Sequence, residues 1–178
     1  MKIFITIFVF AVPIYLSAQK DNNFIDWSGN KRLVWEDFTA EPVKGSDAAA
    51  LTATHLGFSY SFSKNKVAYK IECRFDKTKS WGLVQSDWIL KHEQGHFDIA
   101  EIFARKLHKI VSAYQFNRKT FQKDLDSIYQ SIVTEKEVFQ LQYDNETNFS
   151  RNKLRQEEWL KKIAMLLKEY ESYSAYNS

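Results

Sequence analysis

Two histidines separated by three residues enclose a glutamate in the segment His92-Glu93-Gln94-Gly95-His96. On an α-helix, residues four apart lie on one face about 6 Å from each other, so both imidazoles can bind one metal ion. Zinc accepts imidazole nitrogen at about 2.0–2.1 Å. Glu93 follows His92 by about 100° of helix rotation, which places it beside the ion without requiring it to be a ligand. This HExxH pattern predicts a zinc site in which Glu93 is the general base that activates a metal-bound water.

The residues around this motif predict that both imidazoles project from a buried, mostly apolar face of a helix. Two neutral polar rings in such a place need partners, and a shared metal ion would supply one for both. The competing interpretation is a pair of core histidines that are hydrogen-bonded to their neighbours. Gly95 costs about 1 kcal/mol relative to Ala inside a helix, so close approach of substrate, a neighbouring strand or packed side chains would explain it. The stripe at helical spacing comprises Ile89, His92, His96, Ile99, Phe103 and Ile110.

Three long helices are predicted in the second half of the chain, where apolar residues recur with a period of about 3.6. The first covers residues 88–113 and carries the motif. The second runs from about 117 to 141 and the third from about 151 to 170, with a polar break at 143–150 between them. Residues 171–178 are predicted to be a flexible, frayed tail. The inward-facing residues of the second and third helices are Phe121, Leu125, Ile128, Ile132, Leu154, Ile163, Leu166 and Leu167.

The first half of the chain has the alternation of polar and apolar residues that is typical of antiparallel strands. Residues 51–63 and 67–73 alternate on either side of the turn-prone Lys64-Asn65-Lys66, which predicts a β-hairpin. Residues 32–35 form a further short apolar run, and 38–47, with both prolines, are predicted to be a loop. Strands followed by a long active-site helix and two further helices define an α+β domain.

The first eighteen residues differ from the rest of the chain. Met1-Lys2 gives a short positive start, residues 3–16 are almost wholly apolar, and Ser17-Ala18 precede a polar segment. This pattern predicts a signal peptide, 1–18, followed by a single domain, 19–170. A membrane anchor is the weaker interpretation, because the apolar run is shorter than the roughly 20 residues that span a bilayer.

Composition excludes several other classes of protein. Hydrophobic residues make up 44% of the chain, and five Gly and two Pro argue against disorder or a fibrous repeat. A formal net charge of +3 without a basic cluster predicts no nucleic-acid partner. Cys73 is the single cysteine, so it forms no intramolecular disulfide and is predicted to be a small buried hydrophobe.

Beyond the motif, the sequence resembles the DUF922 family, bacterial proteins that are often described as predicted secreted zinc-dependent proteases. The resemblance implies a zincin-like fold, a zinc ion and peptidase chemistry, and it covers nearly the whole chain after the signal peptide. It rests on Leu33–Phe38, Ala48–Thr52, Ser80-Trp81, Leu90–Glu101, Tyr143-Asp144-x-x-Thr147 and Trp159.

The sequence departs from the family at one position that bears on the metal. The family pattern Tyr-Asp-x-x-Thr-x-His supplies a natural third zinc ligand, but this chain has Phe149 there, and phenylalanine cannot coordinate zinc. Asp144 or Glu146 could complete the three protein ligands of a catalytic zinc. Asp144 could instead orient His92 or His96 through a hydrogen bond, or cap a loop.

Other polar residues are weaker candidates for the site. Tyr143 could stabilise an oxyanion or serve only in packing. Glu101 is nine residues from His92, which places it on the opposite face of the helix. His55 and His108 match no ligand position of the family, and both are predicted to face solvent.

Taken together, these patterns predict a secreted or periplasmic zinc metallohydrolase that acts on a peptide or protein. His92, His96 and Asp144 would hold the zinc, Glu93 would be the base, and no stable membrane insertion is expected once the signal is cleaved. A second hypothesis, motivated by Phe149, is a non-catalytic zincin-fold module for binding or assembly in the cell envelope. A third is a structural helical protein of the envelope in which the motif is accidental.

Overall fold

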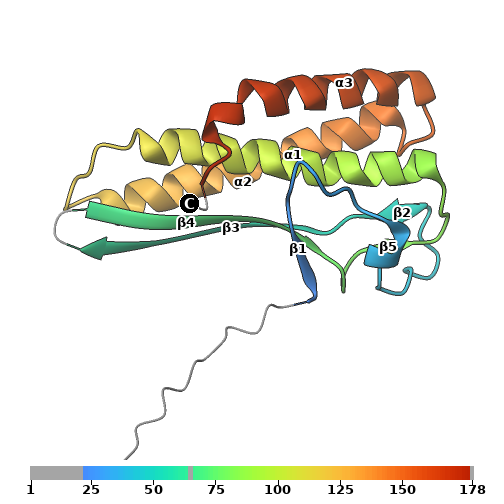
Figure 1. The fold of residues 1–178 in the computed structure, drawn as a ribbon, viewed down its shortest axis with the longest axis horizontal. Coiled ribbons are helices and arrows are strands. Elements are labelled where there is room, and N and C mark those ends of the chain that lie inside the picture. Colours follow the sequence, from blue (N-terminus) through green and yellow to red (C-terminus); the bar gives the residue numbers. More distant parts are fainter. Residues whose placement is uncertain (1–21, 64–65, 177–178) are drawn as a thin grey trace, which may run out of the picture.

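The structure is a computed structural model that describes residues 22–63 and 66–176, and it has an α+β architecture (Figure 1). The first long helix lies on one face of a long β-hairpin, and the other two long helices pack against this helix and against each other. The predicted signal peptide lies outside the described residues and stays a prediction. The elements in chain order are β1 Phe24–Asp26, η1 Trp35–Asp37, β2 Ala50–Leu51, β3 Thr54–Ser63, β4 Lys66–Asp76, β5 Trp81–Gly82, α1 Asp87–Ser112, α2 Phe121–Thr147, α3 Lys153–Glu169 and η2 Glu171–Tyr173.

The predicted hairpin is confirmed. β3 and β4 pair antiparallel in the register Leu56↔Cys73 and Phe58↔Ile71, and β1 adds a short third strand to the free edge of β4. Side chains alternate between a helix-covered face and a solvent face, because the period of a strand is two residues. His55 is exposed, as predicted, whereas Leu56 is buried on the covered face.

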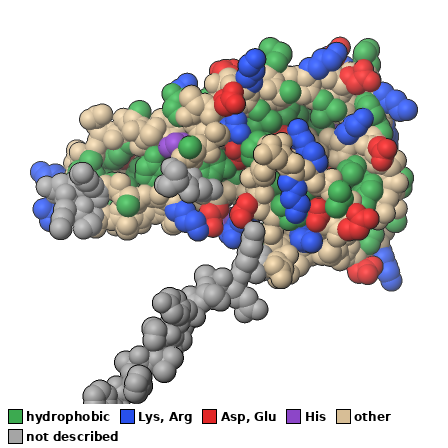
Figure 2. All heavy atoms as spheres, viewed as in Figure 1, with side chains coloured by type: hydrophobic (Ala, Val, Ile, Leu, Met, Phe, Trp, Pro, Cys, Tyr) green, Lys and Arg blue, Asp and Glu red, His purple; other side chains and the backbone are tan. Residues whose placement is uncertain are grey.

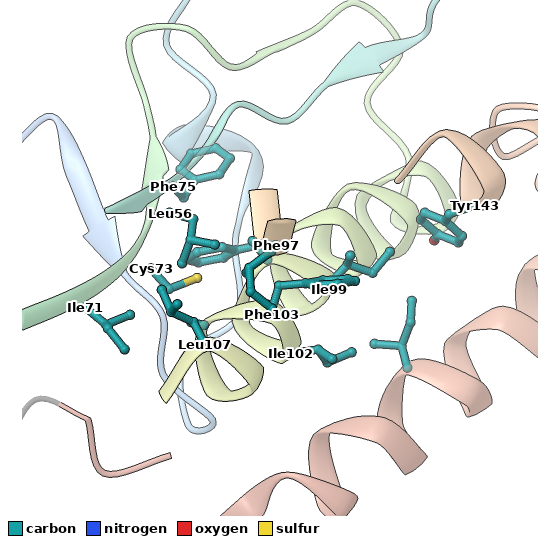
Figure 3. Close-up of a cluster of buried hydrophobic side chains, with 14 of the residues drawn as sticks. Leu56, Ile71, Cys73, Phe75, Phe97, Ile99, Ile102, Phe103, Leu107 and Tyr143 are labelled. Carbon is teal, nitrogen blue, oxygen red and sulfur yellow. The ribbon is translucent and has the colours of Figure 1, made fainter. Parts of the chain in front are cut away.

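Helix α1 forms the centre of the domain. It begins at the N-cap Ser86, whose side chain accepts a hydrogen bond from the Ile89 amide, which satisfies one free donor of the first turn. It packs against β3 and β4 on one side and against α2 and α3 on the other. Figure 3 shows Leu56 and Phe75 of the hairpin facing Phe97 and Leu107 of α1, and Cys73 is buried in the same cluster.

A second, two-stranded sheet holds residues 48–52 in place. β2 pairs with β5 in the register Leu51↔Trp81, and the amides of Leu83 and Val84 both donate to the Ala49 carbonyl at 2.9 Å. Gly82 lies so close to Trp35 that a Cβ at this position would be 2.6 Å from the indole ring. Only glycine permits this approach, so β5 and β2 are fixed against η1.

Several boundaries differ from the prediction. Residues 32–35 form no strand, and Trp35 begins η1. The Leu33 amide donates a hydrogen bond to the Gln94 side chain of α1 instead of to a neighbouring strand. Helix α2 continues through the predicted break to Thr147, and Leu154 of α3 is 68% exposed rather than inward-facing. The predicted loop at 38–47 is confirmed, as it contains no helix or strand.

The C-terminal segment packs against the domain up to Tyr176, the last residue that the structure describes, and the flexibility of residues 171–178 stays a prediction. The Tyr176 hydroxyl donates to Glu101 at 2.5 Å, and the Tyr173 carbonyl accepts a hydrogen bond from His108 at 2.9 Å. His108 is therefore half-buried against this segment, and the prediction that it faces solvent was wrong.

No membrane-spanning helix is found among the described residues, and one face of the molecule has a mixed distribution of charge. None of the described helices is long and apolar enough to cross a bilayer. On the face shown in Figure 2, acidic and basic side chains lie interspersed among apolar ones, without a large patch of one sign.

Candidate metal centre

Helix α1 carries the three residues of the motif, in its second and third turns. His92 and Glu93 are 3% and 4% exposed, and His96 is half-buried. The Nε2 atoms of the two imidazoles face each other at 3.2 Å. The structure thus brings together the two rings that the four-residue spacing predicts to be neighbours.

Asp144 of α2 joins this pair. Its Oδ1 atom lies 3.1 Å from His92 Nε2 and 3.0 Å from His96 Nε2. Asp144 lies inside α2, three residues before its last residue, Thr147, so the alternative that it caps a loop was wrong. Within the described residues, His92, His96 and Asp144 form a group that could hold a metal ion.

The spacing of these three atoms fits a small tetrahedral cation. Four ligands about 2.0–2.1 Å from a zinc ion at tetrahedral angles lie about 3.3–3.4 Å from one another. The three edges in this protein are 3.0, 3.1 and 3.2 Å. Opening each edge by a few tenths of an ångström would therefore admit the ion, and the donor set of two imidazoles and one carboxylate is one that catalytic zinc uses.

Glu93 lines the same cavity as the three donors, with one of its carboxylate oxygens buried. This atom, Oε2, has no hydrogen-bond partner among the described residues. A buried carboxylate oxygen without a partner is costly. A cation a few ångströms away would offset that cost, so the surroundings of Glu93 also fit a metal in this cavity.

The electrostatics of the group favour positive charge between the carboxylates. Burial lowers the pKa of His96, but the hydrogen bond to Asp144 and the negative charge of Glu93 outweigh it and raise the pKa to about 9. Burial raises the pKa of Asp144, but hydrogen bonds from both histidines shift it well below its usual value. A metal cation meets the same negative potential that holds a proton on His96.

Gln140, which sequence reasoning missed, fixes the orientation of His96. Its Nε2 donates to the His96 carbonyl at 2.9 Å, so its Oε1 is left to accept from His96 Nδ1 at 2.5 Å. A proton held on Nδ1 leaves the Nε2 lone pair directed at the proposed ion. The available signal was spacing, since Gln140 precedes Asp144 by one helical turn, but it required α2 to extend beyond 141.

The Nδ1 edge of the His92 ring is held differently from that of His96, by packing against a tyrosine. Its ring stacks on Tyr143 with centroids 4.5 Å apart, and its Nδ1 atom is buried without a partner among the described residues. The Tyr143 hydroxyl donates to the His92 carbonyl at 3.3 Å. Tyr143 is fully buried and does not line the cavity, so packing, and not oxyanion stabilisation, is its role here.

Gly95 is explained by this same tyrosine. A Cβ at Gly95 would lie 2.5 Å from the Tyr143 hydroxyl oxygen and 2.9 Å from its ring carbon Cζ. The close neighbour is therefore a packed side chain of α2, and the alternatives of a strand or a substrate are not needed. The missing Cβ lets α2 approach α1 closely enough for Asp144 to reach both histidines.

The remaining candidates lie outside the group. Glu146 accepts hydrogen bonds from Arg155 at 2.6 Å and from Trp159 at 2.9 Å, so it supports the α2–α3 contact. Glu101 is 1% exposed on the opposite side of α1, as its spacing predicts, and accepts from Arg105 at 2.8 Å.

A cavity of about 360 Å³ lies between α1, α2 and residues 48–52, and it is lined by His92, Glu93, His96 and Asp144. Phe149 lines this cavity, 48% exposed, with a left-handed φ of 50°. Its place beside the metal candidates matches the position at which the family pattern has histidine. The cavity is lined by Ala48–Thr52, Thr54, His92, Glu93, His96, Lys136, Glu137, Gln140, Leu141, Asp144, Phe149 and Ser150.

Comparison with known proteins identifies the family. A family model described as "Bacterial protein of unknown function (DUF922)" matches residues 35–151, and the chain belongs to this family. The matched span includes the whole candidate site but is shorter than the resemblance suggested, since it leaves out Leu33, Val34 and Trp159. No curated protein and no solved structure matches the chain.

Proposed function

We propose that this protein is an exported, zinc-dependent hydrolase of the zincin type that cleaves peptide bonds. The observation that carries the proposal is the convergence of His92 Nε2, His96 Nε2 and Asp144 Oδ1 to within 3.0–3.2 Å of one another at the base of a cavity. The HExxH spacing, the family resemblance and the apolar segment at 3–16 support the same function.

His92, His96 and Asp144 would hold the metal, and an open position would remain for substrate, as in catalytic zinc sites. When bound, zinc supplies a Lewis acid that polarises a carbonyl and lowers the pKa of water toward 7. Glu93 lines the cavity beside both histidines, where it can accept a proton from water and return it to the leaving amine. Gln140 keeps the lone pair of His96 Nε2 directed inward.

Hydrolysis of short peptides by the purified protein tests this proposal. We expect activity that a chelator removes and zinc restores. Glu93→Gln should lower kcat at least a hundredfold, because it removes the base. It should leave the zinc content unchanged, because the three ligands remain. Glu158→Gln, at an exposed carboxylate of α3 that does not line the cavity, is the matched control. Activity that survives Glu93→Gln would overturn the proposal.

The place of Phe149 favours a second candidate, a non-catalytic zincin-fold module that binds a partner in the envelope. An aromatic ring lines the cavity where a histidine would add a nitrogen donor. This candidate expects substoichiometric zinc, no hydrolysis, and a gain of metal affinity in Phe149→His. One tightly bound zinc per chain in the unaltered protein, measured by elemental analysis, would count against it.

A further inference from the structure

One buried charge in the cavity is not used by the proposed chemistry. Lys136 of α2 is only 7% exposed, yet it lines the cavity that contains Glu93 and the three metal candidates. It is the one lysine or arginine among the described residues of that lining. Lysine is almost never buried unless it is paired, so its presence in this wall requires a reason.

Lys136 has one ion pair within the described chain, to a carboxylate that another carboxylate can replace. Its Nζ atom lies 2.9 Å from Oε1 of Glu137, whose side chain is 60% exposed. Because Glu137 can turn into solvent, a substrate carboxylate can take its place without leaving the buried ammonium unpaired. An ammonium has three N–H groups, and Glu137 is the one carboxylate that Lys136 contacts within the described chain.

Helix geometry sets the distance between Lys136 and the metal candidates. Lys136 precedes Asp144 by eight residues on α2, which corresponds to about 12 Å along the helix axis. An extended peptide rises about 3.3 Å per residue. A peptide whose scissile carbonyl lies beside Asp144 therefore has a residue about three or four positions away at the level of Lys136.

Apolar side chains also line the cavity. Leu141, between Lys136 and Asp144 on α2, is 61% exposed, and Leu51 of β2 and Phe149 after α2 are 41% and 48% exposed. All three line the cavity. Large apolar side chains in a cavity are suited to apolar substrate residues, so an apolar residue of the substrate can lie beside Leu141, between Lys136 and the metal candidates.

We propose that Lys136 binds a carboxylate of the substrate, about 12 Å from the scissile bond, and thereby selects acidic peptides. Glu137 occupies Lys136 in the absence of substrate and is displaced when substrate binds. This inference rests on the proposed function, because it assigns Lys136 to binding the substrate of that hydrolase. The binding of an acidic peptide can nevertheless be tested without hydrolysis. The carboxylate can come from an acidic side chain or from the C-terminus of the peptide, and the experiment separates the two.

The test compares matched peptides on the zinc-loaded protein. One series carries Glu or Gln at each position from two to five residues on either side of an apolar pair, and a second series has a free or an amidated C-terminus. Binding is measured with the Glu93→Gln variant by fluorescence anisotropy, and kcat/KM is measured with the active protein. If the Glu peptides bind more tightly than the matched Gln peptides, the carboxylate comes from an acidic side chain. If the peptides with a free C-terminus bind more tightly than the amidated ones, it comes from the C-terminus.

The variants isolate the charge from the packing of the lysine stem. Lys136→Met keeps a buried apolar stem and should weaken binding of the acidic peptide about tenfold or more, because a charge-assisted hydrogen bond is lost. The affinity for the neutral peptide should change less than twofold, and Lys136→Arg should retain the preference for the acidic peptide. Glu137→Gln should increase the affinity for the acidic peptide, because it removes the competing carboxylate. Lys106→Met is the matched control, since Lys106 pairs with Glu135 and does not line this cavity.

Each outcome decides the proposal. Equal loss for acidic and neutral peptides in Lys136→Met, or no preference in the unaltered protein, would show that Lys136 is a packing residue and would overturn it. Hydrolysis without an acidic preference leaves the proposed function intact and overturns this inference alone. Lys136-dependent binding of the acidic peptide without hydrolysis supports the inference and removes the proposed function. Circular dichroism of each variant establishes that it is folded.

Discussion

The two sides of α1 both bury charged and polar residues, but they treat them differently. On the side away from the cavity, Asp98 accepts from Trp27 at 2.8 Å and from Arg32 at 2.7 Å, and Glu101 accepts from Arg105 at 2.8 Å. On the cavity side, Glu93 Oε2 and His92 Nδ1 have no partner within the described residues. The same helix thus carries one satisfied polar network and one unsatisfied group.

The satisfied network is structural. Gln94 accepts from the Leu33 amide and donates to Asp98, each at 2.8 Å, and Tyr176 reaches Glu101 from the C-terminal segment. These contacts fasten both ends of the described chain to α1. The comparison teaches that burial of charge does not by itself indicate a functional site, whereas burial of charge without a partner, beside a cavity, does.

The largest effect is expected on the unsatisfied side. The double variant His92→Ala, His96→Ala removes two of three ligands and should lose all bound zinc, because Asp144 alone cannot retain it. Circular dichroism should show that the fold persists, and elemental analysis should report no metal. If the metal content did not change, the motif would be accidental and the structural helical protein would be the better interpretation.

On the satisfied side, Glu101→Ala should destabilise the fold without removing zinc. It leaves the buried Arg105 uncompensated and unties Tyr176, so we expect a loss of about 3–5 kcal/mol in the free energy of unfolding. Urea denaturation measures the loss. Glu158→Ala is the control, because Glu158 also binds an arginine but at the surface, where a loss below about 1 kcal/mol is expected. A larger effect at Glu158 would contradict the comparison.

Gly95→Ala should affect both sides at once, because Gly95 lies where α2 approaches α1. The new Cβ must displace the buried Tyr143 ring, and overpacking of this kind costs about 1–3 kcal/mol, partly offset by the better helix propensity of alanine. Asp144 moves with Tyr143, so zinc affinity should fall as well. Adding Tyr143→Phe removes the nearest clashing atom and should restore part of both losses, measured by denaturation and by zinc titration. No loss in the single variant would contradict this account.

The smallest effect is expected at Gln140. Gln140→Ala should weaken zinc affinity about tenfold, because His96 loses the acceptor that fixes its proton on Nδ1. Competition with a chelator of known affinity measures the change. Gln142→Ala, on the same helix but outside the cavity lining, is the control and should leave affinity unchanged. Equal effects at both positions would remove the assigned role of Gln140.

Local pattern sufficed for the parts of this protein that depend on neighbours in sequence. The spacing of His92, Glu93 and His96 predicted their shared cavity face, and alternation predicted the hairpin. Local pattern failed to place Asp144 on a helix, because residues 143–147 are polar enough to resemble a break between helices. In the structure Tyr143 and Thr147 are fully buried by α1 and α3. The network of Gln94, Asp98 and Glu101 was also invisible, since its partners are 61 to 75 residues away.

The place of Asp144 on a helix has a consequence for metal selectivity. The three candidate donors lie on two helices, so the distance between α1 and α2 would set the size of an ion bound between them. That gap depends on apolar contacts far from the ion, such as Phe103 against Phe139 with ring centroids 5.7 Å apart. Enlarging or trimming such a contact would shift the preference among the ions that imidazole binds, such as zinc, copper, iron and nickel, with no ligand replaced.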